Sequence, residues 1–371
     1  MGKHLVLVGG GHAHMVTLAN LHTFTDNGHR VTVIGPSDHH YYSGMGPGML
    51  GKTYTPGEIR FKTRHVVEKQ GGTFIRDKAV QILADEKLVA LASGDTVGYD
   101  IISYNLGSYV PRLDLPEDVQ DVYAVKPIER LMEARDRILA LSARKKITIG
   151  ILGGGPSSAE VAGNIWQLTR NGRVQAPDIT IFAGRRFMAR FSRRVTSRIR
   201  KVLSERGIAI NTEGYVTSVR SGAVTLGSGK TYPLDLIFLA VGVVPNPIFR
   251  NSGLATGPDG GLRVNPYLQS VHHPDMFGGG DCIYFEKQPL DKVGVYAVRQ
   301  NPVLYQNLMA ALEETPLQTF DPGGDYLLIF NLGGGRGVLQ KRWLTLNGKA
   351  AFWIKDHIDR KFMKRFQAIE G

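Results

Sequence analysis

The chain has 371 residues, of which 42% are hydrophobic and 21% charged, so its composition excludes a disordered or fibrous protein. Its 45 basic and 33 acidic side chains give a net charge of +12, which indicates anionic partners such as dinucleotides, acidic lipids or nucleic acid, or simply a basic soluble surface. The single cysteine, Cys282, excludes an internal disulfide and a zinc site built from cysteines.

The distribution of apolar residues predicts a cytoplasmic protein. No run approaches the roughly 18 apolar residues of a membrane-spanning helix. The first apolar run, residues 5–8, is too short for the core of a secretory signal and leads directly into a glycine motif.

A βαβ pattern opens the chain. Residues 4–8 form an apolar run that predicts a buried parallel strand, and residues 30–34 predict the next strand. Between them, a glycine turn at residues 9–14 leads into a helix that extends to about Leu21. Such a turn presents free backbone N–H groups at the positive end of a helix, where they attract a pyrophosphate. The pattern therefore predicts a dinucleotide site.

This first glycine motif departs from the usual dinucleotide pattern at two places. Gly9 and Gly11 match its first two glycines, but His14 stands where the pattern has Gly or Ala. The acid that usually follows the second strand is also missing. The ribose contact is therefore expected from backbone atoms, from Ser37 or from Asp38.

The same pattern recurs after a helix predicted at residues 127–141. Residues 147–152 predict a strand, residues 153–158 a second glycine turn, and residues 179–182 the following strand, with a helix from Ala159 onward. One glycine motif alone is weak evidence. Two motifs in the same strand–helix context indicate that one dinucleotide fold has been used twice.

The residues after the strand predicted at 179–182 indicate which nicotinamide nucleotide binds. An NAD site usually has an acid here for the ribose 2′-hydroxyl, whereas an arginine suits a 2′-phosphate. Arg185 and Arg186 stand at this point, so the sequence favours NADPH over NADH. The alternative is that they only precede a solvated basic helix, with Arg193, Arg194, Arg198, Arg200 and Lys201 outward and Val195, Ile199, Val202 and Leu203 buried.

Three stretches, residues 8–14, 42–48 and 125–128, carry a resemblance to a known family. With them the chain resembles the flavoproteins with two dinucleotide-binding domains, the pyridine nucleotide-disulfide oxidoreductase superfamily, in the branch of type II NADH dehydrogenases and sulfide:quinone reductases. Residues 8–14 look most like the flavoprotein module that some organisms fuse to selenide, water dikinase. The resemblance covers nearly the whole chain.

The resemblance implies an α/β fold of two Rossmann-like FAD/NAD(P)-binding domains, the second inserted in the first. Residues 1–112 and 248–325 would form the FAD domain, residues 113–247 the NAD(P)H domain, and residues 326–371 a C-terminal extension. The segment 240–246 is similar to the one that crosses between the two domains in this family.

The resemblance also assigns the cofactor contacts. Asp281 would bind the ribitol chain of FAD, and the free N–H groups of a helix starting near Ala297 would favour negative charge on the reduced flavin. Tyr42, Met45 and Gln300 are expected near the isoalloxazine, and no catalytic side chain or metal ligand is assigned, because the flavin carries the chemistry. The residues expected to bind FAD are Gly9, Gly11, His12, Ala13, His14, Pro36, Ser37, Ser43, Gly44, Val80, Gly107, Gly280, Asp281 and Val298. The residues expected to bind NAD(P)H are Gly153, Gly155, Pro156, Ser157, Ser158, Glu160, Arg185, Arg186 and Gly242.

The cysteine count separates the branches of the family. Disulfide reductases of this fold and sulfide:quinone reductases need a pair of redox cysteines, and Cys282 alone excludes both standard mechanisms. Packing is its expected role, with a redox function as the lesser alternative. Direct transfer from the flavin to an acceptor remains, and a quinone is the usual acceptor in the family.

Histidines flank the predicted flavin site. His12 and His14 are expected to bind phosphate or cap the helix, with proton transfer as the alternative. His39, His40 and the tyrosines that follow either line the flavin or fill the loop, and the sequence does not decide between these.

The C-terminal residues 350–369 predict an amphipathic helix. Its apolar residues are Trp353, Ile354, Ile358, Phe362, Phe366 and Ile369, and its cations are Lys355, Arg360, Lys361, Lys364 and Arg365. Aromatic residues on one side and cations on the other suit an anionic membrane surface. The alternatives are packing on the body and a homodimer contact, while no motif accompanies the helix that would indicate nucleic acid.

These features predict an FAD-dependent oxidoreductase that passes electrons from NAD(P)H to a quinone, on the inner face of the cell membrane. The first alternative is a soluble NAD(P)H-dependent flavoprotein reductase whose acceptor is a protein or a sulfur or selenium compound. The second alternative is a flavin-binding sensor with little turnover.

Overall fold

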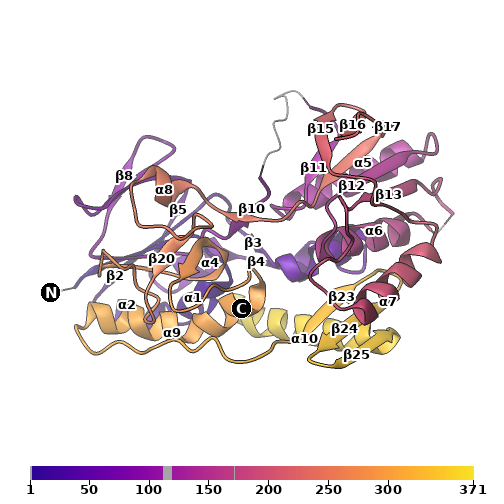
Figure 1. Ribbon diagram of the computed structural model, residues 1–371. Coiled ribbons are helices and arrows are strands. Elements are labelled where there is room, and N and C mark those ends of the chain that lie inside the picture. The colour runs from indigo at the N-terminus through magenta and orange to yellow at the C-terminus, as the bar shows by residue number, and fades with distance from the viewer. Residues whose placement is uncertain (1, 112–118, 171) are drawn as a thin grey trace.

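The structure is a computed structural model that describes residues 2–111, 119–170 and 172–371. The predicted boundary between residues 112 and 113 lies outside the described residues and stays a prediction. Two α/β units stand side by side, and the C-terminal residues lie along one edge of the pair (Figure 1).

The first unit is built on a five-stranded parallel sheet. Its strands are β1 (His4–Val8), β2 (Arg30–Gly35), β5 (Thr73–Arg76), β9 (Ile101–Tyr104) and β21 (Met276–Gly278). They are ordered β21-β9-β1-β2-β5, with Val6 between Thr32 and Ile102. Because β1 is central, all of its residues are buried, as its apolar sequence predicts. The late strand β21 shows that the chain returns to this sheet after leaving it.

Short helices cover this sheet. They are η1 (His12–His14), α1 (Met15–Ala19), α2 (His22–Asp26), α4 (Thr63–Lys69) and the long α9 (Gly294–Leu312). The single helix predicted up to residue 21 is wrong in detail, because the backbone of Asn20 leaves the helical region and ends α1. Helix α9 packs on η1, and the Asn301 side chain joins them by donating to the His12 carbonyl at 2.7 Å.

The second unit repeats this plan. Its parallel strands are β11 (Val122–Ala124), β12 (Thr148–Leu152), β13 (Asp178–Phe182), β14 (Ala209–Asn211) and β18 (Leu236–Leu239), in the order β11-β18-β12-β13-β14. Its helices are α5 (Glu129–Ser142), α6 (Pro156–Thr169) and α7 (Arg193–Ser204). The predicted repeat of strand, glycine turn, helix and strand is confirmed. Helix α7 buries the four apolar residues predicted for it.

Each unit also carries a three-stranded antiparallel sheet ahead of its next parallel strand. The first consists of β6 (Ala79–Leu83), β7 (Leu88–Leu91) and β8 (Thr96–Gly98), and the second of β15 (Val216–Arg220), β16 (Ala223–Leu226) and β17 (Thr231–Pro233). The units are joined by an antiparallel pair of β10 (Ser108–Tyr109) and β19 (Val244–Pro245). Two segments that connect the units therefore run side by side.

A segment of the first unit is buried in the core of the second. The segment consists of η2 (Ser43–Met45) and α3 (Gly46–Leu50). A Cβ on Gly46 would lie 2.7 Å from the Ile128 side chain, and one on Gly51 would lie 2.6 Å from the Asn164 side chain, so glycine permits close packing on α5 and α6. The remaining short elements are β3 (His40–Tyr41), η3 (Gly57–Ile59), β4 (Arg60–Phe61), α8 (Ile248–Asn251), β20 (Leu262–Val264), η4 (Gly280–Cys282) and β22 (Ile283–Phe285).

The C-terminal extension is an antiparallel sheet followed by a helix. It contains β23 (Leu328–Asn331), β24 (Gly337–Lys341), β25 (Leu344–Gly348), α10 (Lys349–Gln367) and η5 (Ala368–Glu370). The sheet packs tightly on α6, where a Cβ on Gly163 would lie 2.1 Å from the Leu332 carbonyl oxygen. Helix α10 continues from there toward the first unit (Figure 1).

The helix at the C-terminus is confirmed, but the apolar face predicted for it is only partly buried: Phe366 is buried and Phe362 and Ile369 pack against the core. Its buried residues are Ala351, Lys355, Asp359, Met363 and Phe366. Trp353 is 67% exposed and Ile358 45% exposed, although both were placed on the apolar face. Lys355 is buried because Asp359 neutralises it at 2.7 Å, a pairing that apolar periodicity does not reveal. Within the described part of the chain, no helix has the length and apolar character needed to cross a membrane.

Candidate functional site

The first glycine turn meets residues 278–281 at Asn105, a buried residue directly after β9. Gly9 has a φ of +94°, and a Cβ on it would lie 2.3 Å from the Asn105 carbonyl oxygen. The Asn105 side chain accepts a hydrogen bond from the Ala13 N–H at 3.1 Å and donates one to the Gly279 carbonyl at 2.7 Å. Asn105 therefore fixes the two segments together. Its only signal in the sequence is its place at the end of a buried strand.

His14 acts as a structural residue of this turn. Its Nδ1 lies 2.7 Å from the Gly9 carbonyl oxygen and its Nε2 lies 2.8 Å from the Ser103 hydroxyl. Burial lowers the pKa of His14 to about 4, so the ring is neutral at physiological pH. The imidazole thus occupies the place where the usual motif has a small residue, and both of its nitrogen atoms have hydrogen-bond partners there.

His12 lies in a half-buried aromatic cluster at the same turn. Its ring stacks on Phe362 with centroids 5.7 Å apart and contacts Tyr42 at 5.0 Å and His40 at 5.2 Å. Burial lowers the pKa of His12 to about 4 and that of His40 to about 3. Within the described ranges of the chain, the buried Nε2 atoms of both rings have no hydrogen-bond partner. Because a buried polar atom without a partner is costly, these atoms suit contacts to a bound polar ligand.

Asp281 lies opposite the turn on η4. Its carboxylate accepts hydrogen bonds from the Ser108 hydroxyl at 2.6 Å and from the Lys126 ammonium at 3.1 Å. Burial opposes ionisation of this group, but the charge of Lys126 and the two hydrogen bonds outweigh it and lower the pKa of Asp281. The carboxylate is therefore ionised and held in one orientation. Lys126 and Ser108 are partners that the sequence pattern did not indicate.

Gln300 supports the same segment from α9. Its side chain is buried and accepts a hydrogen bond from the Gly280 N–H at 2.7 Å. Helix α9 begins at Gly294, three residues before the predicted start at Ala297. Val298 on this helix is 40% exposed, which leaves it accessible to a ligand.

The other residues expected at FAD have varied surroundings. The Ser37 hydroxyl accepts a hydrogen bond from the His39 N–H at 3.2 Å, next to Pro36. Gly107 has a φ of +66° and open space on its Cβ side. Val80 is exposed and is the second residue of β6. Met45 is buried in the core of the second unit, beside Ser43 and Gly44 of η2.

The second glycine turn opens onto the N-terminus of α6. Gly153 has a φ of +127°, and Gly155 caps the helix in an extended conformation without a side-chain hydrogen bond. Apart from their own neighbours along the chain, no atom of the described residues lies within 4 Å of the Cβ position of Gly155 or of Gly242. Pro156 and Ser157 form the first turn of this helix, and Ser158 is buried behind it. The uncapped N–H groups and the open space suit a pyrophosphate.

Glu160 connects α6 to the C-terminal extension. Its carboxylate accepts a hydrogen bond from the Asn331 N–H at 2.8 Å. Burial raises the pKa of Glu160 to about 7, although the nearby Lys355 opposes this. Glu160 was predicted as a nucleotide ligand; in the structure its hydrogen-bond partner belongs to the extension.

Arg185 and Arg186 follow β13 in an exposed bend. The preceding Gly184 has a φ of +65°, and a Cβ on it would lie 2.5 Å from the ring of Tyr215. Tyr215 is itself 64% exposed, so a flat exposed ring lies beside the two arginines. The sequence did not indicate Tyr215.

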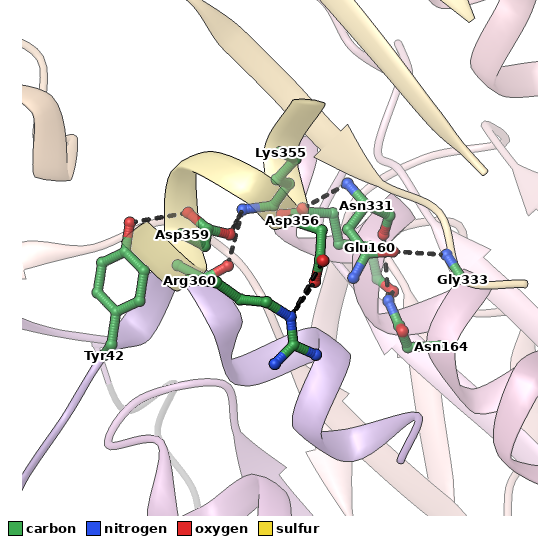
Figure 2. Close-up of polar contacts among 10 residues, drawn as sticks. Tyr42, Glu160, Asn164, Asn331, Gly333, Lys355, Asp356, Asp359 and Arg360 are labelled. Carbon is green, nitrogen blue, oxygen red and sulfur yellow. Dashed lines mark hydrogen bonds and ion pairs between the residues drawn. The ribbon is translucent and has the colours of Figure 1, made fainter. Parts of the chain in front are cut away.

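A buried polar network joins α10 to the loop after β3 (Figure 2). The Lys355 ammonium donates to the Asp359 carboxylate at 2.7 Å and to the Gly44 carbonyl at 3.0 Å, and the Tyr42 hydroxyl donates to Asp359 at 3.1 Å. One residue further along α10, Arg360 donates to Asp356 at 3.0 Å. Burial raises the pKa of Tyr42 well above its usual value, and the carboxylate of Asp359 adds to this.

The protein has been compared with known families and proteins. The model of the family described as pyridine nucleotide-disulphide oxidoreductase matches residues 3–310. Demethylphylloquinone reductase NdbB of Synechocystis is 25% identical, over 94% of this chain and 89% of that protein. Type II NADH:quinone oxidoreductase of Staphylococcus saprophyticus is 22% identical, over 99% of this chain and 96% of that protein. Sulfide:quinone oxidoreductase of Aquifex aeolicus has a similar fold, with a TM-score of 0.81 at 18% identity over 99% of this chain and 92% of that one.

The ion pair of Asp281 leads to the first prediction. Asp281→Ala should lower FAD affinity by roughly tenfold to a hundredfold, because a hydrogen bond to a charged group contributes about 1.5–3 kcal/mol. Isothermal titration of the apoprotein with FAD measures this. Glu286→Ala is the matched control, since it breaks the exposed ion pair of Glu286 with Arg263 in the same unit. Equal FAD affinity in Asp281→Ala and the unmodified protein would contradict the assigned role.

Proposed function

The chain belongs to the pyridine nucleotide-disulphide oxidoreductase family, and from that premise we propose that it passes electrons from NAD(P)H through FAD to a quinone. It is an oxidoreductase that uses FAD, with NAD(P)H as its co-substrate. The observation that carries the proposal is the pair of glycine turns, each at the carboxyl end of the central strand of its own parallel sheet.

The residues around the first turn fit FAD. The unpartnered Nε2 atoms of His12 and His40 offer polar contacts, and the ionised carboxylate of Asp281 offers an acceptor for a hydroxyl group. When bound, FAD supplies the hydride and electron transfer itself. The rings of Tyr42 and Phe362 cover His12 and exclude water from this end of the turn.

The burial and protonation of Cys282 support direct electron transfer from the flavin to an acceptor, without a thiol as intermediate. Its side chain is buried, and its sulfur lies 3.3 Å from the Gly279 carbonyl oxygen. Burial raises the pKa of the Cys282 thiol to about 11, so it is not a thiolate near neutral pH. The relatives are named demethylphylloquinone reductase NdbB and type II NADH:quinone oxidoreductase, which supports a quinone as the acceptor.

We propose NADPH as the preferred electron donor. Arg185 and Arg186 are exposed directly after β13, where the motif for NAD would have an acid. Two guanidinium groups beside the exposed ring of Tyr215 suit a phosphorylated adenosine, because arginine pairs with phosphate through paired hydrogen bonds.

We also propose that the C-terminal extension binds the anionic inner face of the cell membrane. Its exposed apolar residues are Trp343, Leu344, Leu346, Trp353 and Ile358. Its exposed cations are Lys341, Arg342, Lys349, Lys361, Lys364 and Arg365. Together these residues form the extension face. Aromatic side chains surrounded by cations suit the interface of an anionic bilayer.

The second prediction concerns the overall reaction. Under anaerobic conditions NADPH should bleach the flavin absorbance, and a quinone should restore it faster than protein, sulfur or selenium acceptors do. Stopped-flow spectroscopy with each nucleotide and each acceptor measures both half-reactions. Reoxidation by a non-quinone acceptor alone would establish the soluble reductase instead, and no reduction by either nucleotide would favour a sensor.

The third prediction concerns nucleotide choice. The double variant Arg185→Glu and Arg186→Glu should lower the NADPH-to-NADH ratio of kcat/KM by at least about tenfold, because it replaces charge-assisted contacts with repulsion. Steady-state kinetics with both nucleotides measure the ratio. The exposed pair Arg193→Glu and Arg194→Glu on α7 is the matched control. A ratio that stays constant in the first double variant would disprove the assignment.

The fourth prediction concerns the extension face. Trp343→Ala combined with Trp353→Ala should weaken binding to vesicles of anionic phospholipid at least about tenfold, because exposed indole rings would otherwise be buried in the interface. Co-sedimentation with anionic and with zwitterionic vesicles measures this. Tyr215→Ala removes an exposed aromatic ring elsewhere and serves as the control. A concentration-dependent dimer that the double variant abolishes, without vesicle binding, would identify a homodimer contact instead.

A further inference from the structure

Lys126 is a cation held at the junction of the two segments that form the FAD site. It lies just before α5, and its side chain is 27% exposed. Its ammonium donates to the Asp281 carboxylate at 3.1 Å and to the Ser108 hydroxyl at 2.9 Å. The Ser108 hydroxyl donates to the same carboxylate oxygen at 2.6 Å. Lys126 is thus fixed by two partners rather than extended into solvent.

Among the residues that the structure describes, the other groups around Lys126 supply no comparable charge. His12 and His40 are neutral because burial lowers the pKa of their rings, and Lys126 itself adds to this effect. Lys292 also lies near Asp281, but its ammonium is paired with Asp259 at 2.7 Å and donates to a carbonyl oxygen. The direct neutralising partner of the Asp281 carboxylate is therefore Lys126.

The charge balance at Asp281 depends on this pair. With Lys126 present, the ammonium and the carboxylate together carry no net charge. Without Lys126, an ionised carboxylate would stand alone at a partly buried position, where charges interact more strongly than in water. Uptake of electrons by a flavin places negative charge on it, and an uncompensated carboxylate nearby would oppose that charge.

We propose that Lys126 is a positioning residue that neutralises Asp281 and thereby raises the reduction potential of the bound FAD. The inference rests on the proposed binding of FAD at this site. In this proposal Asp281 has two separable properties. The oxygen atoms of Asp281 would contact the cofactor, and Lys126 balances the charge of Asp281. Substitutions that change the charge and substitutions that change the hydrogen bonds should therefore have different effects.

The test measures the potential rather than turnover. Lys126→Met keeps the length of the side chain and removes its charge. At equilibrium with a reference dye, its ratio of reduced to oxidised flavin should fall at least tenfold, about 30 mV for a two-electron couple. Lys126→Arg keeps the charge and should stay within about threefold of the unmodified protein. Lys145→Met removes a lysine that pairs with Asp235 in the second unit and should leave the ratio unchanged.

A double variant separates charge balance from simple structural damage. Lys126→Met combined with Asp281→Asn removes both charges. When this double variant is loaded with excess FAD, the reduction potential of its bound flavin should be close to that of the unmodified protein. A double variant as low in potential as Lys126→Met alone would overturn the inference. An unchanged potential in flavin-loaded Lys126→Met would overturn it as well. An unmodified protein that takes up no FAD would overturn the proposed function together with it, so the two failures are distinguishable.

Discussion

The side-chain amide of Asn105 is the contact on which the proposed FAD site depends. Its oxygen accepts from the Ala13 N–H in the first glycine turn, and its nitrogen donates to the Gly279 carbonyl, 174 residues further along the chain. A buried amide satisfied on both sides leaves little freedom to either segment. Because β21 is added to the sheet beside β9, the late segment can reach this amide at all.

The same junction shows why charge and contact must be considered together. Two neutral histidines and one ionised carboxylate lie around the turn, and a lysine from the loop before α5 balances the carboxylate. Lys126 precedes a helix of the second unit, whereas Asp281 belongs to the first. The ion pair therefore spans the two units as well as setting the charge of the site. Any displacement of one unit against the other would change both the contact and the electrostatics.

The sequence predicted those parts of the fold in which local pattern decides the outcome. Buried parallel strands are continuously apolar and glycine turns are locally encoded, so β1, β12 and both turns were predictable. Asn105 and Lys126 were not, because their partners lie far away in the sequence, and the resemblance of residues 125–128 to the family did not indicate a contact for Lys126. The buried polar residues of α10 were missed for a related reason. Apolar periodicity places Lys355 outside, whereas Asp359 and the Gly44 carbonyl satisfy it inside.

The inward face of α10 limits what the extension can offer to a membrane. Lys355 and Asp359 are buried together, and separating them from Tyr42 and Gly44 would leave desolvated charges without partners, which is costly. The helix therefore cannot rotate about its axis to expose Phe366 to lipid without breaking these contacts. The residues free to meet a membrane are those on the other side, Trp353 and Ile358, together with the tip of the β24–β25 hairpin at Trp343. A membrane contact of this protein would thus use the edge of the extension, while the helix core stays attached to the flavin-site loop.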